Sequence, residues 1–378
     1  MHHLITGATG FVGGAITLEL LSSTNADLTV LVRADKNTDP RRRVHERLDS
    51  MAVGYDLHDV RAEIQKRIRV VVGDITHEDI TSDLIGPVDQ LWHCAASLRY
   101  KEKDRDEIEL HNVCGTKNVL ALARMLDVPV FNYISTAYVA GSMTGEIFER
   151  PVESCELANN AYESSKIRSE WLVEQEREKR NIRILRPSIV IGHSRTLYAV
   201  NHSGIYGFAR RLLRFREQSV ESLGNFLEHT RLHLLAEPEI PLNLVPIDMV
   251  ARNAVAISLS NSNEIYFHLA NATPPTVGDA VVELMRLLRY RLPIWVDGSS
   301  DFTSVDYTLN AGVDFYGSYL RNGKNFLTEH TQAAIGELSV DFPMNSSSIR
   351  EYFWSYLTAQ PFFNTLRLSP NRTIHTIS

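Results

Sequence analysis

The stretch Thr6-Gly7-Ala8-Thr9-Gly10-Phe11-Val12-Gly13 decides the fold of this chain. It follows a short strand-like segment, His3-Leu4-Ile5, and precedes a helical pattern from Ala15 to Leu21. In a turn between a strand and a helix, Gly7 permits the tight turn, Gly10 lets the backbone approach a pyrophosphate, and Gly13 lets the helix pack closely on the strand. The helix N-terminus adds free N–H groups and a positive dipole end. The stretch therefore predicts a dinucleotide-binding turn.

The composition is that of an ordinary globular protein. The chain has 378 residues, 44% of them hydrophobic and 22% charged, which is enough apolar material for one large domain or two closely joined ones. The net charge of −7 argues against a nucleic-acid binder. The three cysteines have no paired spacing, which suits a reducing compartment, and the histidines form no metal-binding pattern.

The sequence contains no apolar run of about 18 residues that would span a membrane. A strand-like segment already begins at His3, which leaves no room for a signal peptide before it. We therefore expect a cytoplasmic protein with no membrane span and no bound metal.

Strand-like and helical segments alternate along the first half of the chain. Further strand patterns lie at residues 28–32, 69–72, 90–94, 129–134 and 182–185. Helical patterns lie between them at 38–66, 108–126 and 159–179, and the charged run 101–106 is typical of an exposed loop. This alternation predicts an α/β fold with a doubly wound parallel sheet.

The expected domains follow from where the alternation fades. We expect a Rossmann domain that binds NADP at residues 1–192, with residues 242–272 returning to it. A smaller, mainly helical substrate-binding region would comprise residues 193–241 and 273–378. Its arginines at positions 210–216 either meet an anionic group of the substrate or form a solvated helix face.

Residues that follow the predicted strands indicate the cofactor. Arg33 follows the strand pattern 28–32, where an acidic residue would bind the ribose 2′-OH of NAD and an arginine can hold the 2′-phosphate of NADP. Arg33 therefore predicts NADPH. The run Arg41-Arg42-Arg43 either adds to this phosphate site or forms a solvated helix start. Asp74 is either an adenine ligand or a turn residue, and the small residues Ala95-Ala96 leave room for ribose and pyrophosphate.

Tyr162 and Lys166 lie four residues apart, on one face of a predicted helix. A phenol can donate a proton to a carbonyl oxygen that gains charge, and a nearby cation lowers the phenol pKa and can hold the nicotinamide ribose. The spacing alone is a weak signal, but the helix follows the fifth strand and would line the nicotinamide end. Thr136, which follows that strand, can supply a second hydroxyl. These three residues predict hydride transfer.

The order of these motifs resembles the extended short-chain dehydrogenase/reductase superfamily over about residues 4 to 270. The motifs are Gly7-x-x-Gly10-x-x-Gly13, Ser135-Thr136, Tyr162-x-x-x-Lys166 and Arg186-Pro187-Ser188. Further details are similar to the thioester reductase and fatty acyl reductase branch: Val30 to Ala34, the helical insertion after it, His93 to Ala96, and Ser135 to Val139 with Gly141, Gly145 and Glu146.

The resemblance implies an NADPH-dependent reductase of an acyl thioester, carried on coenzyme A or on an acyl carrier protein, with an aldehyde or alcohol as product. It implies catalytic roles for Thr136, Tyr162 and Lys166. It implies cofactor contacts at Gly7, Thr9, Gly10, Phe11, Val12, Gly13, Arg33, Asp74, Ile75, Ala95, Ala96, Lys166, Pro187, Ser188 and Ile189.

Two alternatives stay open. Another extended reductase, acting on a ketone, a hydroxysteroid-like or a nucleotide-sugar substrate, would use the same tyrosine and lysine. Sugar-nucleotide members usually carry an acidic residue at the position of Arg33, and dehydratases tend to place Asp-Glu where Ala137-Tyr138 stand. A redox-sensing protein that holds NADPH without turnover needs no proton donor, so Tyr162 and Lys166 argue against that alternative.

Overall fold

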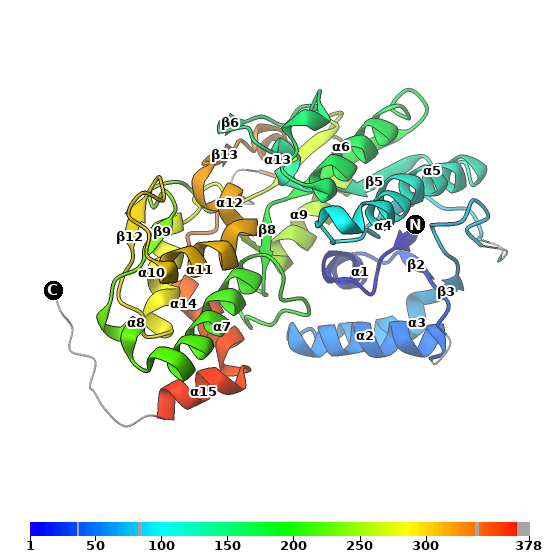
Figure 1. Cartoon of the computed structure of the whole chain (residues 1–378). Coiled ribbons are helices and arrows are strands. Elements are labelled where there is room, and N and C mark those ends of the chain that lie inside the picture. Colours follow the sequence, from blue (N-terminus) through cyan, green and yellow to red (C-terminus); the bar gives the residue numbers. More distant parts are fainter. Residues whose placement is uncertain (36–37, 82, 84, 337–339, 369–378) are drawn as a thin grey trace. The chain divides into compact units, whose positions relative to one another are not determined.

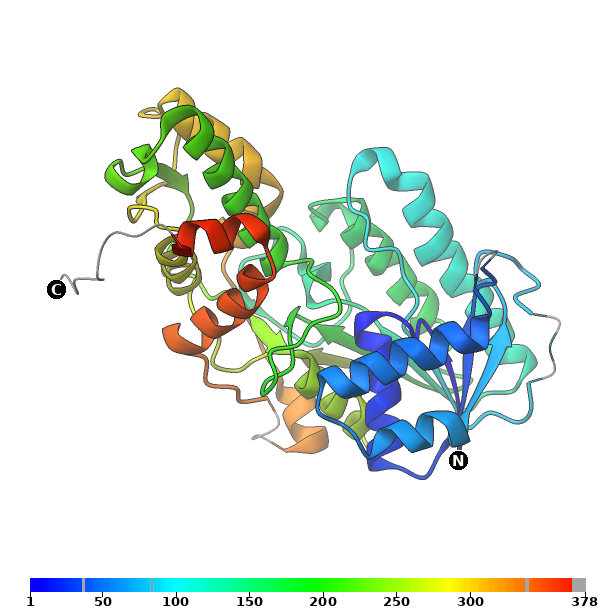
Figure 2. The same cartoon turned by 90° about the horizontal axis from the view of Figure 1, so that it is seen from below.

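The computed structural model describes residues 1–35, 38–81, 83, 85–336 and 340–368, and the chain divides into two compact units (Figures 1 and 2). The first comprises Met1–Asn201, Asn243–Pro274 and Lys324–Pro343. The second comprises His202–Leu242, Pro275–Gly323 and Met344–Ser378. The boundaries differ from those expected, because residues 193–201, 273–274, 324–336 and 340–343 fold with the first unit and Leu242 with the second.

A parallel sheet forms the centre of the first unit. In the described residues it has seven strands in the order β11-β7-β5-β4-β1-β2-β3. The strands are β1 (His2–Thr6), β2 (Asp27–Val32), β3 (Ile68–Val72), β4 (Gln90–His93), β5 (Val130–Ile134), β7 (Asn181–Pro187) and β11 (Tyr266–Leu269). The sheet grows from β1 in one direction through β2 and in the other through β4, so the ends of β1 and β4 form a topological switch point, where open α/β sheets bind ligands.

Helices cover both faces of this sheet (Figure 1). On one face α1 (Phe11–Ser23) packs against α9 (Ile247–Leu259), with α2 (Pro40–Gly54) and α3 (Val60–Arg67) beside them. On the other face α5 (Gly115–Met125) packs against α6 (Ala161–Glu174). Neighbouring residues of β1 enter opposite cores, Ile5 the first and Leu4 the second. Strands buried on both faces are typical of a doubly wound sheet, and the predicted fold class is confirmed.

Three local predictions need correction. The charged run 101–106, predicted as a loop, forms the 3-10 turn η1 (Glu102–Asp104) and the start of α4 (Arg105–Ile108). Neighbouring opposite charges support this helix, because Arg105 pairs with Glu102 three residues away. The predicted helix 108–126 contains a π-helical segment, η2 (Glu109–Cys114), and the predicted helix 159–179 ends at Glu174.

Short elements complete the first unit around the carboxyl ends of the central strands. Strand β8 (Ile189–Ile191) pairs with β10 (Leu244–Pro246), and β6 (Gly145–Ile147) pairs with β13 (Lys324–Phe326); both pairs are parallel. The remaining elements are η3 (Ala137–Ala140), η4 (Cys155–Leu157) and α13 (Glu329–Ile335). The β6–β13 pair explains why residues 324–336 and 340–343 belong to this unit.

The second unit is mainly helical. Its helices are α7 (Ile205–Leu223), α8 (Phe226–His229), α10 (Val277–Leu287), α11 (Ser304–Val313), η5 (Asp314–Tyr316), α12 (Gly317–Arg321), α14 (Ser346–Thr358) and α15 (Pro361–Leu368). Strands β9 (His233–Leu235) and β12 (Ile294–Val296) pair in parallel. Of the α7 arginines considered above, Arg216 is buried and donates to the Glu228 carboxylate at 2.6 Å, whereas those at 210, 211 and 214 are exposed. In the described part of the chain, no helix combines the length and apolar character needed to cross a membrane.

Candidate active site

The glycine turn connects β1 to α1 with very little space around its backbone. Gly7 has a φ of +74°, and a Cβ built on it would lie 2.6 Å from the backbone nitrogen of Ala95. A Cβ on Gly13 would lie 2.3 Å from the Gly7 carbonyl oxygen, to which Gly10 N–H donates at 2.9 Å. Helix α1 begins at Phe11 directly after Gly10, which has no side chain to cap it. The N–H groups of its first turn are therefore suited to a phosphate.

A hollow of about 940 Å³ lies beside this turn, at the carboxyl ends of β1, β2, β3 and β4. The predicted cofactor residues in its lining are Gly7, Thr9, Gly10, Arg33, Asp74, Ile75, Ala95 and Ala96. The other predicted residues lie elsewhere: Phe11, Val12 and Gly13 in the first turn of α1, Lys166 on α6, and Pro187, Ser188 and Ile189 at the junction of β7 and β8. The structure thus brings together the residues predicted for the adenosine and pyrophosphate.

One end of the hollow carries two arginines. Exposed Arg33 lies with Nη1 3.4 Å from Nε2 of His111. The Arg43 guanidinium donates to the carbonyl oxygen of Arg33 and pairs with Asp35 at 3.3 Å. All of these residues line the hollow. Because both arginines line the hollow, this part of it suits a phosphate.

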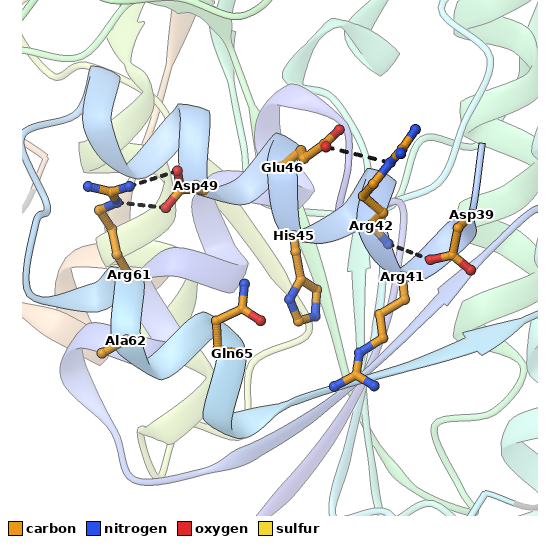
Figure 3. Close-up of a pocket in the computed structure, with 9 residues that line it drawn as sticks. All are labelled: Asp39, Arg41, Arg42, His45, Glu46, Asp49, Arg61, Ala62 and Gln65. Carbon is orange, nitrogen blue, oxygen red and sulfur yellow. Dashed lines mark hydrogen bonds and ion pairs between the residues drawn. The ribbon is translucent and has the colours of Figure 1, made fainter.

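Arg41 and Arg42, which precede Arg43, do not line the hollow beside the glycine turn. Arg41 and Arg42 line a separate hollow between α2 and α3, shown in Figure 3. There the Arg42 side chain pairs with Glu46 at 3.6 Å, and Arg61 pairs with Asp49 at 2.6 Å. The structure therefore divides the basic run, with only Arg43 of the three lining the hollow beside the glycine turn.

Asp74 is a turn residue in the structure, and it also lies in the lining of the hollow. Its Oδ1 accepts hydrogen bonds from the backbone N–H and the hydroxyl of Thr76, both at 2.9 Å. Burial acts to raise the pKa of Asp74, but these bonds and the Arg33 charge outweigh it and hold the pKa below its usual value. Asp74 is thus an ionised turn residue that also lines the hollow.

Lys166 is held at the end of β5. Its ammonium donates to the Ile134 carbonyl oxygen at 2.7 Å and lies 4.4 Å from the ring centre of Tyr133. Burial lowers the pKa of Lys166, against the effect of Tyr162, Glu170 and Cys94. Cys94, which contributes to this effect, follows β4 and lines the hollow beside the glycine turn.

Tyr162 lies one turn before Lys166 on α6. Asn160 caps this helix by accepting a hydrogen bond from the N–H of Glu163 at 3.0 Å. The Tyr162 side chain is half-buried. Burial raises the pKa of its phenol, and the neighbouring Lys166 charge opposes that rise. A half-buried phenol beside a buried cation can act as a proton donor to a bound carbonyl.

Thr136 lies just beyond β5 and begins η3. Its hydroxyl oxygen accepts from the N–H of Tyr138 at 3.2 Å and lies 3.5 Å from the Pro187 carbonyl oxygen. Thr136 and Lys166 are therefore both anchored at the carboxyl end of β5, and Pro187 comes from the neighbouring strand β7. Ser188 makes a different contact: its hydroxyl donates to Oδ1 of Asn243 at 2.7 Å.

Asn112, a residue that the sequence did not mark as functional, connects the elements of this site. It lies in the π-helical segment η2, and such segments often occur at functional sites. Its side-chain NH₂ donates to the Ser97 carbonyl oxygen at 3.1 Å and to the Ser165 hydroxyl at 2.9 Å. Its side-chain oxygen Oδ1 accepts from the Ser97 N–H at 2.7 Å. It thereby joins the segment after β4 to α6. The only sequence signal was a polar residue within an apolar helical pattern.

His93 at the end of β4 forms part of a second buried chain. Its Nδ1 lies 2.8 Å from the Thr6 hydroxyl and its Nε2 lies 3.1 Å from the Thr116 hydroxyl. Burial, assisted by the Lys166 charge, lowers the pKa of His93 to about 3. The His93 ring is therefore neutral at physiological pH. Its two hydrogen bonds connect β4 to Thr6 of β1 and to Thr116 of α5.

A family model described as Male sterility protein, of the NAD-binding type, matches residues 5–254, more than half of the chain. The chain belongs to this family.

Among the curated proteins similar to this chain are fatty acyl-CoA reductases. The chain is 31% identical over 221 residues to fatty acyl-CoA reductase 1 of Xenopus laevis and 30% identical over 222 residues to fatty acyl-CoA reductase 2 of Homo sapiens. Each match covers 50% of this chain and 42% of the relative. The chain therefore spans less than half the length of these reductases.

Two solved structures share the fold over most of the chain. The terminal R domain from the myxalamid PKS-NRPS biosynthetic pathway has a TM-score of 0.73 at 23% identity and covers 96% of this chain and 91% of its own. A thiolation-reductase di-domain from an archaeal non-ribosomal peptide synthetase has a TM-score of 0.75 at 21% identity, covering 96% and 76%. The family match confirms the resemblance at the level of the family, and the solved structures confirm the fold.

Proposed function

We propose that this family member is an NADPH-dependent reductase of acyl thioesters, carried on coenzyme A or on an acyl carrier protein. The observation that carries the proposal is the buried Lys166 ammonium, which donates to the Ile134 carbonyl oxygen at the end of β5 and lies one helical turn after Tyr162 on α6. The relatives named fatty acyl-CoA reductases and the thiolation-reductase di-domain support a thioester as the substrate.

The residues of the site fit NADPH. The crowded Gly7 and Gly13 positions and the uncapped start of α1 suit a pyrophosphate, and Arg33 with Arg43 suits a 2′-phosphate. When bound, this cofactor supplies a hydride to the thioester carbonyl carbon. Lys166 would hold the nicotinamide ribose from the α6 side.

Side chains of this protein supply the proton for the reduction. Tyr162 donates its phenolic proton to the carbonyl oxygen as that oxygen gains negative charge, and Lys166 stabilises the tyrosinate left behind. The Thr136 hydroxyl donates a second hydrogen bond to the same oxygen. The resulting hemithioacetal expels its thiol and becomes an aldehyde, which a second cycle with the same groups would convert to an alcohol.

A substrate panel tests this function. The purified chain is mixed with NADPH and a series of acyl-CoA thioesters, acyl carrier protein thioesters, ketones and nucleotide sugars, and NADPH consumption is followed. The proposal expects turnover with at least one thioester and free thiol as a product. Turnover with a ketone or a nucleotide sugar, together with none on any thioester, would overturn it.

Replacing Arg33 with serine is expected to weaken NADPH binding by roughly 10- to 150-fold while leaving NADH binding nearly unchanged. The physical reason is the loss of a charge-assisted hydrogen bond to the 2′-phosphate, about 1.5–3 kcal/mol. The dissociation constants of both cofactors are measured by fluorescence titration. Arg41→Ser, in the separate hollow between α2 and α3 (Figure 3), is the matched control and should change neither constant. Equal weakening of both cofactors in Arg33→Ser would contradict a 2′-phosphate contact.

A further inference from the structure

Tyr133 is a buried aromatic residue of β5 to which the mechanism above assigns no role. Only 1% of it is exposed, and it lies in the core that also contains Val119 of α5 and Val173 of α6. The side chain of the next residue, Ile134, enters the opposite core. A strand buried on both faces needs a large apolar side chain at position 133 but not an aromatic one. The contacts of the ring show what an aromatic residue adds.

The Lys166 ammonium lies over the face of this ring. Its Nζ is 4.4 Å from the ring centre of Tyr133, and it donates a hydrogen bond to the Ile134 carbonyl oxygen at 2.7 Å. Both contacts therefore come from adjacent residues of β5. An ammonium has three N–H donors, and this hydrogen bond uses one of them. The negative face of the ring supplies a further attractive contact to the cation.

Lys166 needs such contacts because it is buried. Only 2% of it is exposed, and a buried charge is costly unless other groups compensate it. Burial lowers the pKa of Lys166, and Tyr162 and Glu170 on α6 and Cys94 after β4 oppose that change. The Glu170 carboxylate, however, accepts two hydrogen bonds from Arg186 at 2.9 and 2.6 Å, so its charge is shared with that guanidinium. The ring contact also favours the charged form of Lys166.

The Tyr133 ring is itself held in place from β4. The ring of His93 lies 5.7 Å from it between centroids, at an interplanar angle of 36°. Hydrogen bonds to the hydroxyls of Thr6 and Thr116 hold the His93 ring, and with a pKa of about 3 it is neutral at physiological pH. A neutral ring rather than a competing cation therefore packs against Tyr133. Since Thr6 lines the hollow beside the glycine turn, a continuous set of contacts connects that lining to the Lys166 ammonium.

We propose that Tyr133 is a positioning residue of the candidate active site, whose ring face, together with the Ile134 carbonyl oxygen, holds the Lys166 ammonium at the carboxyl end of β5. The inference rests on the proposed role of Lys166 in holding the nicotinamide ribose and assisting Tyr162. Because both contacts come from β5, the strand that precedes Thr136 also orients the cation of the site.

The titration of Lys166 tests this contact by comparing a ring with an aliphatic side chain at position 133. The full chain is labelled with ¹³C at the lysine ε carbon, and the Lys166 signal is identified by its loss in Lys166→Arg. Its pH titration is then followed over the range in which circular dichroism shows a folded chain. Tyr133→Leu removes the ring and should lower the Lys166 midpoint by about one pH unit, whereas Tyr133→Phe keeps the ring face and should titrate near the wild type.

Phe131→Leu is the matched control, because Phe131 is a fully buried aromatic residue two positions earlier on β5 and in the same core. It should lose stability in urea, as Tyr133→Leu does, but leave the Lys166 midpoint unchanged. A Tyr133→Leu midpoint that is not lower than that of the wild type would overturn the inference. An equal fall in Phe131→Leu would overturn it too, since loosened packing would then cause the shift. So would an equal fall in Tyr133→Phe, since the phenol hydroxyl rather than the ring face would then be responsible.

If Tyr133→Leu does not fold, a fluorinated ring decides the question. Pentafluorophenylalanine at position 133 keeps the shape of phenylalanine but withdraws negative charge from the ring face. The Lys166 midpoint should then lie below that of Tyr133→Phe. Equal midpoints in these two chains would overturn the inference.

This measurement needs neither cofactor nor substrate. The Lys166 shifts test the inference whether or not the wild-type chain reduces a thioester, so failure of the proposed function and failure of the inference are separate results. Where a thioester is turned over, the alkaline limb of the kcat profile should move to lower pH in Tyr133→Leu and stay in place in Phe131→Leu.

Discussion

Replacing Tyr162 with phenylalanine is expected to slow thioester reduction by roughly 10²- to 10⁴-fold, the range in which a positioned acid contributes to catalysis. The phenol is the group that gives a proton to the developing oxyanion, and phenylalanine keeps the ring but has no proton to give. Because the side chain is half-buried and lies on the surface of α6, the substitution should leave the fold intact. The kcat is measured at saturating NADPH and thioester.

Cofactor binding distinguishes this chemical role from a structural one. The NADPH dissociation constant of Tyr162→Phe should stay within about twofold of the wild type, because the phosphate contacts lie at the glycine turn and at Arg33. Tyr307→Phe, at an exposed position of α11 in the second unit, is the matched control and should retain full activity. A Tyr162→Phe enzyme with wild-type kcat would mean that another group donates the proton.

Replacing Glu170 with leucine is expected to lower the free energy of unfolding by about 3–5 kcal/mol, the cost of leaving one buried charge without its partner. Glu170 and Arg186 are each only 1% exposed, and the carboxylate accepts from Nε and Nη2 of Arg186 at 2.9 and 2.6 Å. Arg186 also donates to the Arg150 carbonyl oxygen and lies over the Tyr266 ring. Leucine would leave this guanidinium charged and buried.

Urea titration of the purified chain measures this effect. Glu178→Leu removes a carboxylate that is 83% exposed and pairs with Arg177, so its effect should stay below about 1 kcal/mol. The double variant Glu170→Leu/Arg186→Met should recover most of the lost stability, because it removes both charges together. Equal midpoints for Glu170→Leu and Glu178→Leu would show that the buried pair does not stabilise the fold.

Local patterns were sufficient for the elements that lie close together in the sequence. The glycine turn, the strands that follow it and the four-residue spacing of Tyr162 and Lys166 all express short-range geometry: a turn that excludes side chains, an apolar run buried on both faces and one helical turn. The doubly wound parallel sheet and its helical cover were predictable for that reason. The prediction of a loop at 101–106 was wrong. Its charges were taken as a sign of a loop, but in the structure Arg105 pairs with Glu102 along a helix.

Contacts between distant segments were not predictable in the same way. The pattern of residues 41–43 does not indicate that Arg43 lines the cofactor hollow while Arg41 and Arg42 line another, since this depends on how α2 packs. The contacts of Asn112 were not predictable either, because it lies in a π-helical segment. Such a segment has more residues per turn than an α-helix, which changes which side chains share a face.

Local sequence patterns are enough to identify the fold class and the dinucleotide-binding turn, and they mark the residues on which the proposed chemistry depends. The folded chain adds that residues 324–336 and 340–343 return to the first unit and that Lys324 is buried there. The reason is physical. A three-residue strand such as β13 has no periodicity of its own, and its place is determined by the hydrogen bonds that β6 offers and by the packing of Phe326 on Tyr138.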